Sequence, residues 1–176
     1  GIKVHVIAQD LQEVGAAATL MNAISALNLT VDTLVNNAGF GVSAPFAKAD
    51  GAKTSGMMQL NMVTLTELTH MVLPAMLERR HGRIMNIASV AAFQACPYFA
   101  VYAATKAYVL SFTEALAAEV ADRGVLVTAV CPGSTATGFH EAANSQGALI
   151  NKISDSAEMV AEEAYKALNN GKVVVV

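Results

Sequence analysis

Short apolar runs alternate with longer segments whose apolar residues recur at helical spacing, and this alternation constrains the fold more than any other feature. Runs rich in β-branched residues predict strands, whereas apolar residues three and four apart predict helices. The expected strands are 2–8, 32–35, 84–88, 125–130 and 173–176, and the expected helices are 11–27, 57–78, 98–121 and 157–168. Since the strands are apolar on both faces, we expect an α/β fold in which helices cover each side of a parallel sheet.

The length of 176 residues fits one domain that spans residues 1–176. Residues 134–156 differ from the rest of this domain, because they are polar and contain glycine between two firmly predicted elements. They are too many for an ordinary connection. We therefore expect this segment to be mobile or to form a lid over the substrate.

The charge pattern argues against binding to nucleic acid or to a membrane. Only 14% of the residues are charged and the net charge is −3, so no basic stripe is present to neutralise phosphates. The basic run 79–83 follows an apolar periodic segment, and we interpret it as a helix C-terminus that stops at Gly82. The uncharged run 84–105 is interrupted by polar residues and by Pro97, so it does not predict a membrane-spanning helix.

The two cysteines, Cys96 and Cys131, lie in apolar surroundings without metal-binding or redox spacing. We expect buried free thiols, which fit a reducing compartment, and therefore a cytoplasmic protein. The four histidines are scattered and lack carboxylates at ligand spacing, so the sequence predicts no metal site.

Polar and glycine residues follow several of the expected strands. They are Asp10, Asn36 to Gly39, Ser89, and the pair Pro132 and Gly133. In open parallel sheets ligands bind beyond the carboxyl ends of the strands, so these residues are the first candidates for a binding site.

The stretch YAATK places Tyr102 and Lys106 one helical turn apart on the same face of the expected helix 98–121. A free phenol has a pKa of about 10 and is a poor acid or base at neutral pH. A nearby ammonium favours phenolate, and lowering the pKa by about three units requires roughly 4 kcal/mol of differential interaction. Tyr102 would then suit general acid-base work, with Ser89 holding a substrate oxygen.

These residues form an ordered series along the chain: Asn36-Asn37-Ala38-Gly39 after a strand, Asn61 in a helix, Ser89 after a strand, Tyr102 with Lys106, Pro132-Gly133 after a strand, and Thr137. Their order and spacing resemble the short-chain dehydrogenase/reductase family over essentially the whole chain. The resemblance implies a Rossmann-like, doubly wound, three-layer α/β/α fold. It also implies an oxidoreductase that transfers hydride between NAD(P)(H) and a secondary alcohol or carbonyl compound. The alternative is a non-catalytic binding or regulatory protein that retains the fold.

The resemblance assigns a role to each matching residue. Tyr102 would exchange a proton with the substrate oxygen, and Ser89 would orient that oxygen. Lys106 would bind the nicotinamide ribose and depress the pKa of Tyr102, while Asn61 would hold a water in the proton relay. Asp10 would reach the adenine, the 36–39 turn would pack against the adenosine half, and the later residues would border the nicotinamide. The expected cofactor-binding residues are Asp10, Asn36, Asn37, Ala38, Gly39, Tyr102, Lys106, Pro132, Gly133 and Thr137.

The sequence departs from the family pattern at its start. The glycine-rich pyrophosphate loop of the family is absent, and Gly1 leads directly into a strand that resembles the family's third. We therefore expect that a strand-helix-strand-helix unit is missing in front. By itself the 176-residue chain should bind dinucleotide poorly and catalyse little, and strand 2–8 should pair with strand 32–35.

The cofactor is expected to be NAD or NADP; the choice stays open, with a slight preference for NADP. The residues that normally decide it would lie in the absent loop. The family also implies a homodimer or homotetramer and a small alcohol or ketone substrate, with neither nucleic acid nor a membrane as partner.

Overall fold

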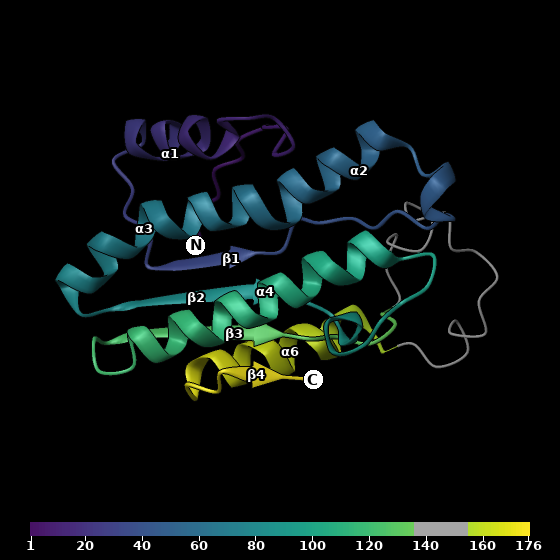
Figure 1. Ribbon diagram of the computed structural model, residues 1–176. Coiled ribbons are helices and arrows are strands. Elements are labelled where there is room, and N and C mark those ends of the chain that lie inside the picture. Colours follow the sequence, from purple (N-terminus) through teal and green to yellow (C-terminus); the bar gives the residue numbers. More distant parts are fainter. Residues whose placement is uncertain (136–154) are drawn as a thin grey trace.

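Four parallel strands form one sheet in the order β1-β2-β3-β4 (Figure 1). The computed structural model describes residues 1–135 and 155–176. The strands are β1 (Thr33–Asn36), β2 (Gly82–Ile87), β3 (Val125–Val130) and β4 (Val174–Val175). Because all four run in the same direction, their carboxyl ends lie along one edge of the sheet, where ligands bind in folds of this kind.

Helices cover both faces of the sheet, as the two neighbouring residues Ile84 and Met85 of β2 illustrate. Ile84 packs in one apolar cluster with side chains of α3 (Leu65–Arg79) and α4 (Ala100–Glu119). Met85 packs on the opposite face with side chains of α6 (Ala157–Asn169). Successive side chains of a strand point to opposite faces, so both sides of β2 are buried. The expected α/β fold with a parallel, helix-covered sheet is confirmed.

The segment expected to be one helix over 57–78 consists of three parts. A first helix, α2 (Gly51–Met58), runs into a π-helical turn, η2 (Gln59–Thr64), and α3 follows. The predicted start was wrong because Asp50 caps α2, its carboxylate accepting a hydrogen bond from the backbone N–H of Lys53 at 3.0 Å. Single π-helical turns inside α-helices are frequent at functional sites, and this one contains Asn61.

Three expectations about residues 1–27 were wrong: the strand over 2–8, its pairing with strand 32–35, and the start of the first helix. Residues 1–10 form no strand, do not pair with β1, and leave Ile2 and Val6 96% and 89% exposed. The helix expected from residue 11 begins later, as α1 (Ala16–Ala26), after Gly15 with φ +83°. A strand needs a neighbour for its N–H and C=O groups, and none of the described strands lies beside residues 2–8.

The remaining expected elements appear within about two residues of their predicted bounds. Two short 3₁₀ turns, η1 (Phe46–Lys48) and η3 (Val90–Phe93), were not predicted. The glycine stop at Gly82 was also wrong. Arg80 takes the left-handed conformation that ends α3 (φ 52°), and Gly82 already opens β2.

Within the part of the chain that the structure describes, no helix combines the length and apolar character needed to cross a membrane. The cysteines Cys96 and Cys131 are both free, as expected, but only Cys131 is fully buried.

Candidate active site

The candidate site lies where β2 ends and the first half of α4 begins. Ser89 follows β2, and Tyr102 and Lys106 are one turn apart on α4. All three side chains are buried. The fold therefore brings together residues that lie up to seventeen positions apart, as parallel strands followed by helices are expected to do.

Lys106 is buried deeply for a lysine, with only 7% of its surface exposed. Its ammonium donates a hydrogen bond to the carbonyl oxygen of Ile87 at 2.6 Å and lies 5.8 Å from the centre of the Tyr102 ring. Burial lowers the pKa of the ammonium to about 8, because the charged form loses hydration. A lysine with such a pKa is typical of a functional site rather than of a protein surface.

Tyr102 forms a side-chain hydrogen bond with Ser89, and this bond lowers the pKa of the phenol. Burial acts more strongly in the opposite direction, so the pKa of Tyr102 is raised overall. The expectation that Lys106 depresses this pKa is therefore not met in the structure. Lys106 is not among the causes of this shift: its ammonium is directed to the Ile87 carbonyl, and desolvation of the phenolate outweighs the hydrogen bond with Ser89.

Ser89 is held in place from both sides by the backbone. The N–H of Ala88 donates to the carbonyl oxygen of Val130 at 2.7 Å, and the N–H of Val90 donates to the carbonyl oxygen of Pro132 at 3.1 Å. The Ser89 hydroxyl oxygen also accepts a bond from the N–H of Ala91 at 3.1 Å. This pairing continues the β2–β3 ladder past the strand ends, so it brings Pro132 alongside Ser89.

Asn61 is 2% exposed and uses its whole side-chain amide inside the protein. Its Oδ1 accepts from the N–H of Phe40 at 3.3 Å. Its Nδ2 donates to the carbonyl of Phe40 at 3.0 Å and to the Thr105 hydroxyl at 3.1 Å. Both amide hydrogens therefore have protein acceptors, so a relay water would have to donate to an oxygen of Asn61, and this role stays a prediction.

The turn after β1 lies against the same group of residues. A Cβ placed on Gly39 would lie 3.0 Å from Oδ1 of Asn61 and 3.6 Å from Nζ of Lys106. The backbone of the turn thus packs tightly against the Asn61 amide and lies within ordinary contact distance of Lys106. Asn37 is exposed, and its N–H donates to the carbonyl of Val35 at 3.1 Å.

Asn36 was expected to contact cofactor, but its side chain points into the protein. Nδ2 of Asn36 donates to Oδ1 of Asn86 at 2.9 Å and to the Thr69 hydroxyl at 3.2 Å. Asn86 in turn donates to the Thr113 hydroxyl at 2.9 Å. This buried network fastens β1 to β2, α3 and α4, and the contact of Asn36 with the cofactor stays a prediction.

The other expected cofactor residues lie apart from this cluster or beyond the described chain. Asp10 is exposed, and its carboxylate accepts from the N–H of Gln12 at 2.9 Å in the turn before α1. Gly133 is exposed, and a Cβ added to it would meet nothing within 4 Å. Thr137 and most of the expected lid fall within residues 136–154, which lie outside the described residues.

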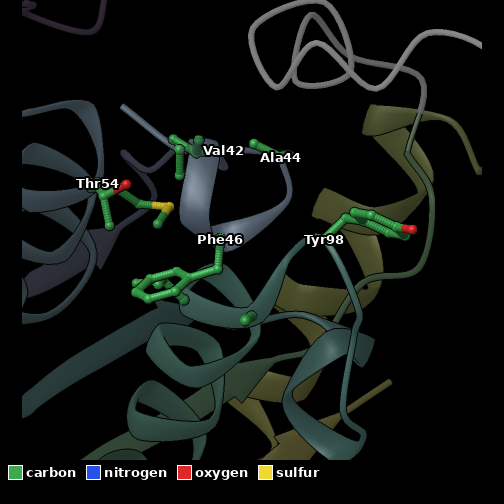
Figure 2. A pocket seen from close by; sticks show the side chains of 9 residues that line it. Val42, Ala44, Phe46, Thr54 and Tyr98 are labelled. Atoms are coloured by element: carbon green, nitrogen blue, oxygen red, sulfur yellow. The ribbon is translucent and has the colours of Figure 1, made fainter. Parts of the chain in front are cut away.

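A small, mainly apolar pocket lies beside the first turn of α4 (Figure 2). Val42 and Ala44 line it from the loop after β1, and Phe46 and Thr54 from η1 and α2. The backbone carbonyl of Tyr98 accepts a hydrogen bond from the N–H of Ala44 at 3.0 Å, and Tyr98 has a positive φ of 68°. The Tyr98 ring points away from that of Phe46 (Figure 2). The loop after β1 is thereby tied to the segment that leads into the candidate site.

Sequence reasoning missed Thr105, which is 1% exposed and bonds to Asn61. Its position directly before Lys106 was the available signal. Among residues 1–135 and 155–176, no group of three or more His, Cys, Asp or Glu side chains is placed to hold a metal ion.

Two of the curated proteins that this chain resembles are named as reductases. The chain is 31% identical over its whole length to the ketoacyl reductase HetN of a Nostoc species, and covers 61% of that protein. It is 39% identical to an acetoacetyl-CoA reductase of an Acinetobacter species, over 76% of this chain and 54% of the relative. The chain thus spans little more than half the length of these curated relatives.

Among solved structures, a short-chain dehydrogenase from Sphingobium yanoikuyae in complex with NADPH matches with a TM-score of 0.83 at 26% identity. The match covers 95% of this chain and 64% of that one. A gluconate 5-dehydrogenase from Burkholderia cenocepacia, in complex with NADP and tartrate, shares the fold with a TM-score of 0.80 at 24% identity. That match covers 94% of this chain and 70% of the other.

The family model described as short chain dehydrogenase matches residues 1–148, which include every residue of the Ser89, Tyr102 and Lys106 cluster. The chain belongs to the short-chain dehydrogenase/reductase family.

Proposed function

We propose that this chain carries the proton-transfer residues of an NAD(P)-dependent oxidoreductase that interconverts a secondary alcohol and a carbonyl compound. One observation carries the proposal. A buried phenol bonds to a serine hydroxyl and lies beside a buried ammonium whose pKa is lowered to about 8. Three such groups at the carboxyl edge of a parallel sheet are suited to holding an oxygen and moving a proton to or from it.

The roles follow from the chemistry of each group. Ser89 would donate to the substrate oxygen, and Tyr102 would deliver a proton to that oxygen during carbonyl reduction. Because burial raises the pKa of Tyr102, its phenol is protonated at neutral pH, which is the form that acts as an acid. Lys106 would stabilise the phenolate that remains after proton transfer.

The residues present fit the nicotinamide end of a dinucleotide. An ammonium carries three N–H donors, and one of those of Lys106 bonds to Ile87, so the group can also donate to ribose hydroxyls. The turn at Gly39 lies beside Lys106, and a side chain there would crowd Oδ1 of Asn61. The bound cofactor would supply the hydride. Two structural relatives contain NADPH or NADP, which favours a test with NADPH first.

Relatives suggest the first substrates to test. Ketoacyl reductase and acetoacetyl-CoA reductase are the names of proteins 31% and 39% identical to this chain. We therefore propose a 3-ketoacyl thioester as the first carbonyl substrate, with simple ketones as the wider class. Assembly into a homodimer or homotetramer and a cytoplasmic location remain predictions, to be tested by size-exclusion chromatography and cell fractionation.

The test uses the full-length protein with NADH or NADPH and a panel that includes acetoacetyl-CoA, ketones and aldehydes. Wild type should oxidise the cofactor with at least one substrate. Tyr102→Phe should lower kcat by about 10² to 10⁴-fold while cofactor binding persists. Tyr108→Phe is a matched control, because Tyr108 lies on the same helix and bonds to Thr66, away from the site. Cofactor binding without turnover in any form would favour the non-catalytic alternative.

A further inference from the structure

The hydroxyl of Thr105 links the helix that carries Tyr102 and Lys106 to the π-helical turn that carries Asn61. It donates to the backbone carbonyl of Tyr102 at 2.7 Å and accepts from Nδ2 of Asn61 at 3.1 Å. We propose that Thr105 is a positioning residue, which orients the Asn61 amide so that Asn61 clamps the Gly39–Phe40 backbone beside Lys106.

The donor and acceptor count supports this direction of action. A hydroxyl has one hydrogen, and that of Thr105 is used on the Tyr102 carbonyl. Thr105 can therefore only accept from Asn61, so the NH₂ group of the amide must face Thr105. The Oδ1 of Asn61 is then left to accept the N–H of Phe40, while the second amide hydrogen goes to the Phe40 carbonyl.

The clamp acts where the turn meets Lys106. Gly39 precedes Phe40, and a Cβ on Gly39 would be 3.0 Å from Oδ1 of Asn61 and 3.6 Å from Nζ of Lys106. Because the amide bonds to both the N–H and the carbonyl of Phe40, a displacement of the amide would move the turn relative to the ammonium. The effect on turnover rests on the proposed function, whereas the clamp itself does not.

Helix α4 offers a matched control in Thr113. Its buried hydroxyl donates to the carbonyl of Val109 at 2.6 Å and accepts from Nδ2 of Asn86 at 2.9 Å. Thr113 thus makes the same pair of hydrogen bonds to its own helix and to a buried asparagine, two turns beyond Thr105. Replacing either threonine by valine removes a similar pair of buried bonds, but only the Thr105 pair touches the clamp.

The experiment measures hydrogen exchange of the Phe40 amide in the full-length protein and in Thr105→Val, Thr105→Ser and Thr113→Val. Loss of one well-made hydrogen bond corresponds to a change of about tenfold. We expect exchange at Phe40 to speed up by about tenfold or more in Thr105→Val, and to stay within about threefold of wild type in the other two. Unchanged exchange at Phe40 in Thr105→Val, or an equal change in Thr113→Val, would overturn the proposal.

The KM for the cofactor is a second readout, which a loss of stability alone would not change. Thr105→Val should lower kcat/KM by about tenfold, mainly by raising KM for the cofactor, with rescue by Thr105→Ser. Thr113→Val should keep both KM and the pH profile. If the wild-type protein turns over no substrate, the proposed function fails, and the exchange rates at Phe40 still decide the role of Thr105.

Discussion

The ammonium of Lys106 donates a 2.6 Å hydrogen bond to the backbone carbonyl of Ile87, the last residue of β2. This bond joins the helix that carries Tyr102 to the strand that leads into Ser89. The bond holds the positive charge in a buried position. Burial disfavours the charged form and lowers the pKa of Lys106 to about 8.

The lowered pKa of Lys106 predicts how stability depends on pH. In the unfolded chain the ammonium titrates near 10.5, so between about pH 8 and 10.5 the unfolded state binds more protons than the folded state. The free energy of unfolding should therefore rise through this window, by about 3 kcal/mol from this one group. Below pH 8 the cost of the buried charge is fully present.

Urea denaturation of Lys106→Met at several pH values would check this expectation. The variant should lack the rise and should be at least as stable as wild type at pH 7, because a buried charge is replaced by an apolar chain of similar length. Lys53→Met, at an exposed position on α2, should keep the wild-type slope. An identical pH dependence in Lys106→Met and wild type would contradict the burial argument.

Gly39→Ala should impair the site more than the fold. The new Cβ would lie 3.0 Å from Oδ1 of Asn61, so the turn or the amide must shift by a few tenths of an ångström. We expect kcat/KM of the full-length protein to fall by about tenfold or more while Tm changes little. Gly51→Ala, whose Cβ would meet nothing within 4 Å at the start of α2, should keep the activity. Equal activities in the two variants would count against a close approach of the turn.

Asn86→Ala should destabilise the fold strongly. The substitution removes one acceptor of the Asn36 amide and the donor to the Thr113 hydroxyl. Asn36 and Thr113 are both buried, so water cannot readily replace these bonds. Breaking such a network costs about 2–4 kcal/mol in the free energy of unfolding. Asn22→Ala, at an exposed position on α1, should change it by less than about 0.5 kcal/mol. Chemical denaturation of both variants would compare the two costs directly.

Gly124→Ala should be more costly than Gly171→Ala, although both glycines have positive φ, +77° and +67°. A Cβ on Gly124 would collide with the backbone carbonyl of Arg80, whereas on Gly171 it would meet only Cδ2 of Leu126 at 3.5 Å. We expect about 1 kcal/mol for Gly171→Ala and more than about 3 kcal/mol for Gly124→Ala. Similar melting temperatures would show that the turn before β3 can move.

Two predictions that rest on neighbours in the sequence were confirmed. The strand 125–130 was predicted with the bounds that β3 has, and the helix that carries Tyr102 and Lys106 was predicted to within two residues at each end. The prediction of strand 2–8 was wrong, because apolar alternation alone does not form a strand when no neighbouring strand is available for pairing. The start of α2 was missed because Asp50, its cap, lies before any apolar periodicity.

The sequence by itself determined that the chain forms a parallel α/β sheet, and that Ser89 follows a strand while Tyr102 and Lys106 share one face of a helix. These features follow from the two- and 3.6-residue periods of strands and helices, which are local properties of the chain. Only the tertiary structure decided the pKa of Tyr102 and of Lys106, the inward turn of Asn36, and the contact from Thr105 through Asn61 to Phe40. Burial and hydrogen bonds between residues more than ten positions apart govern these properties, and no local pattern encodes them.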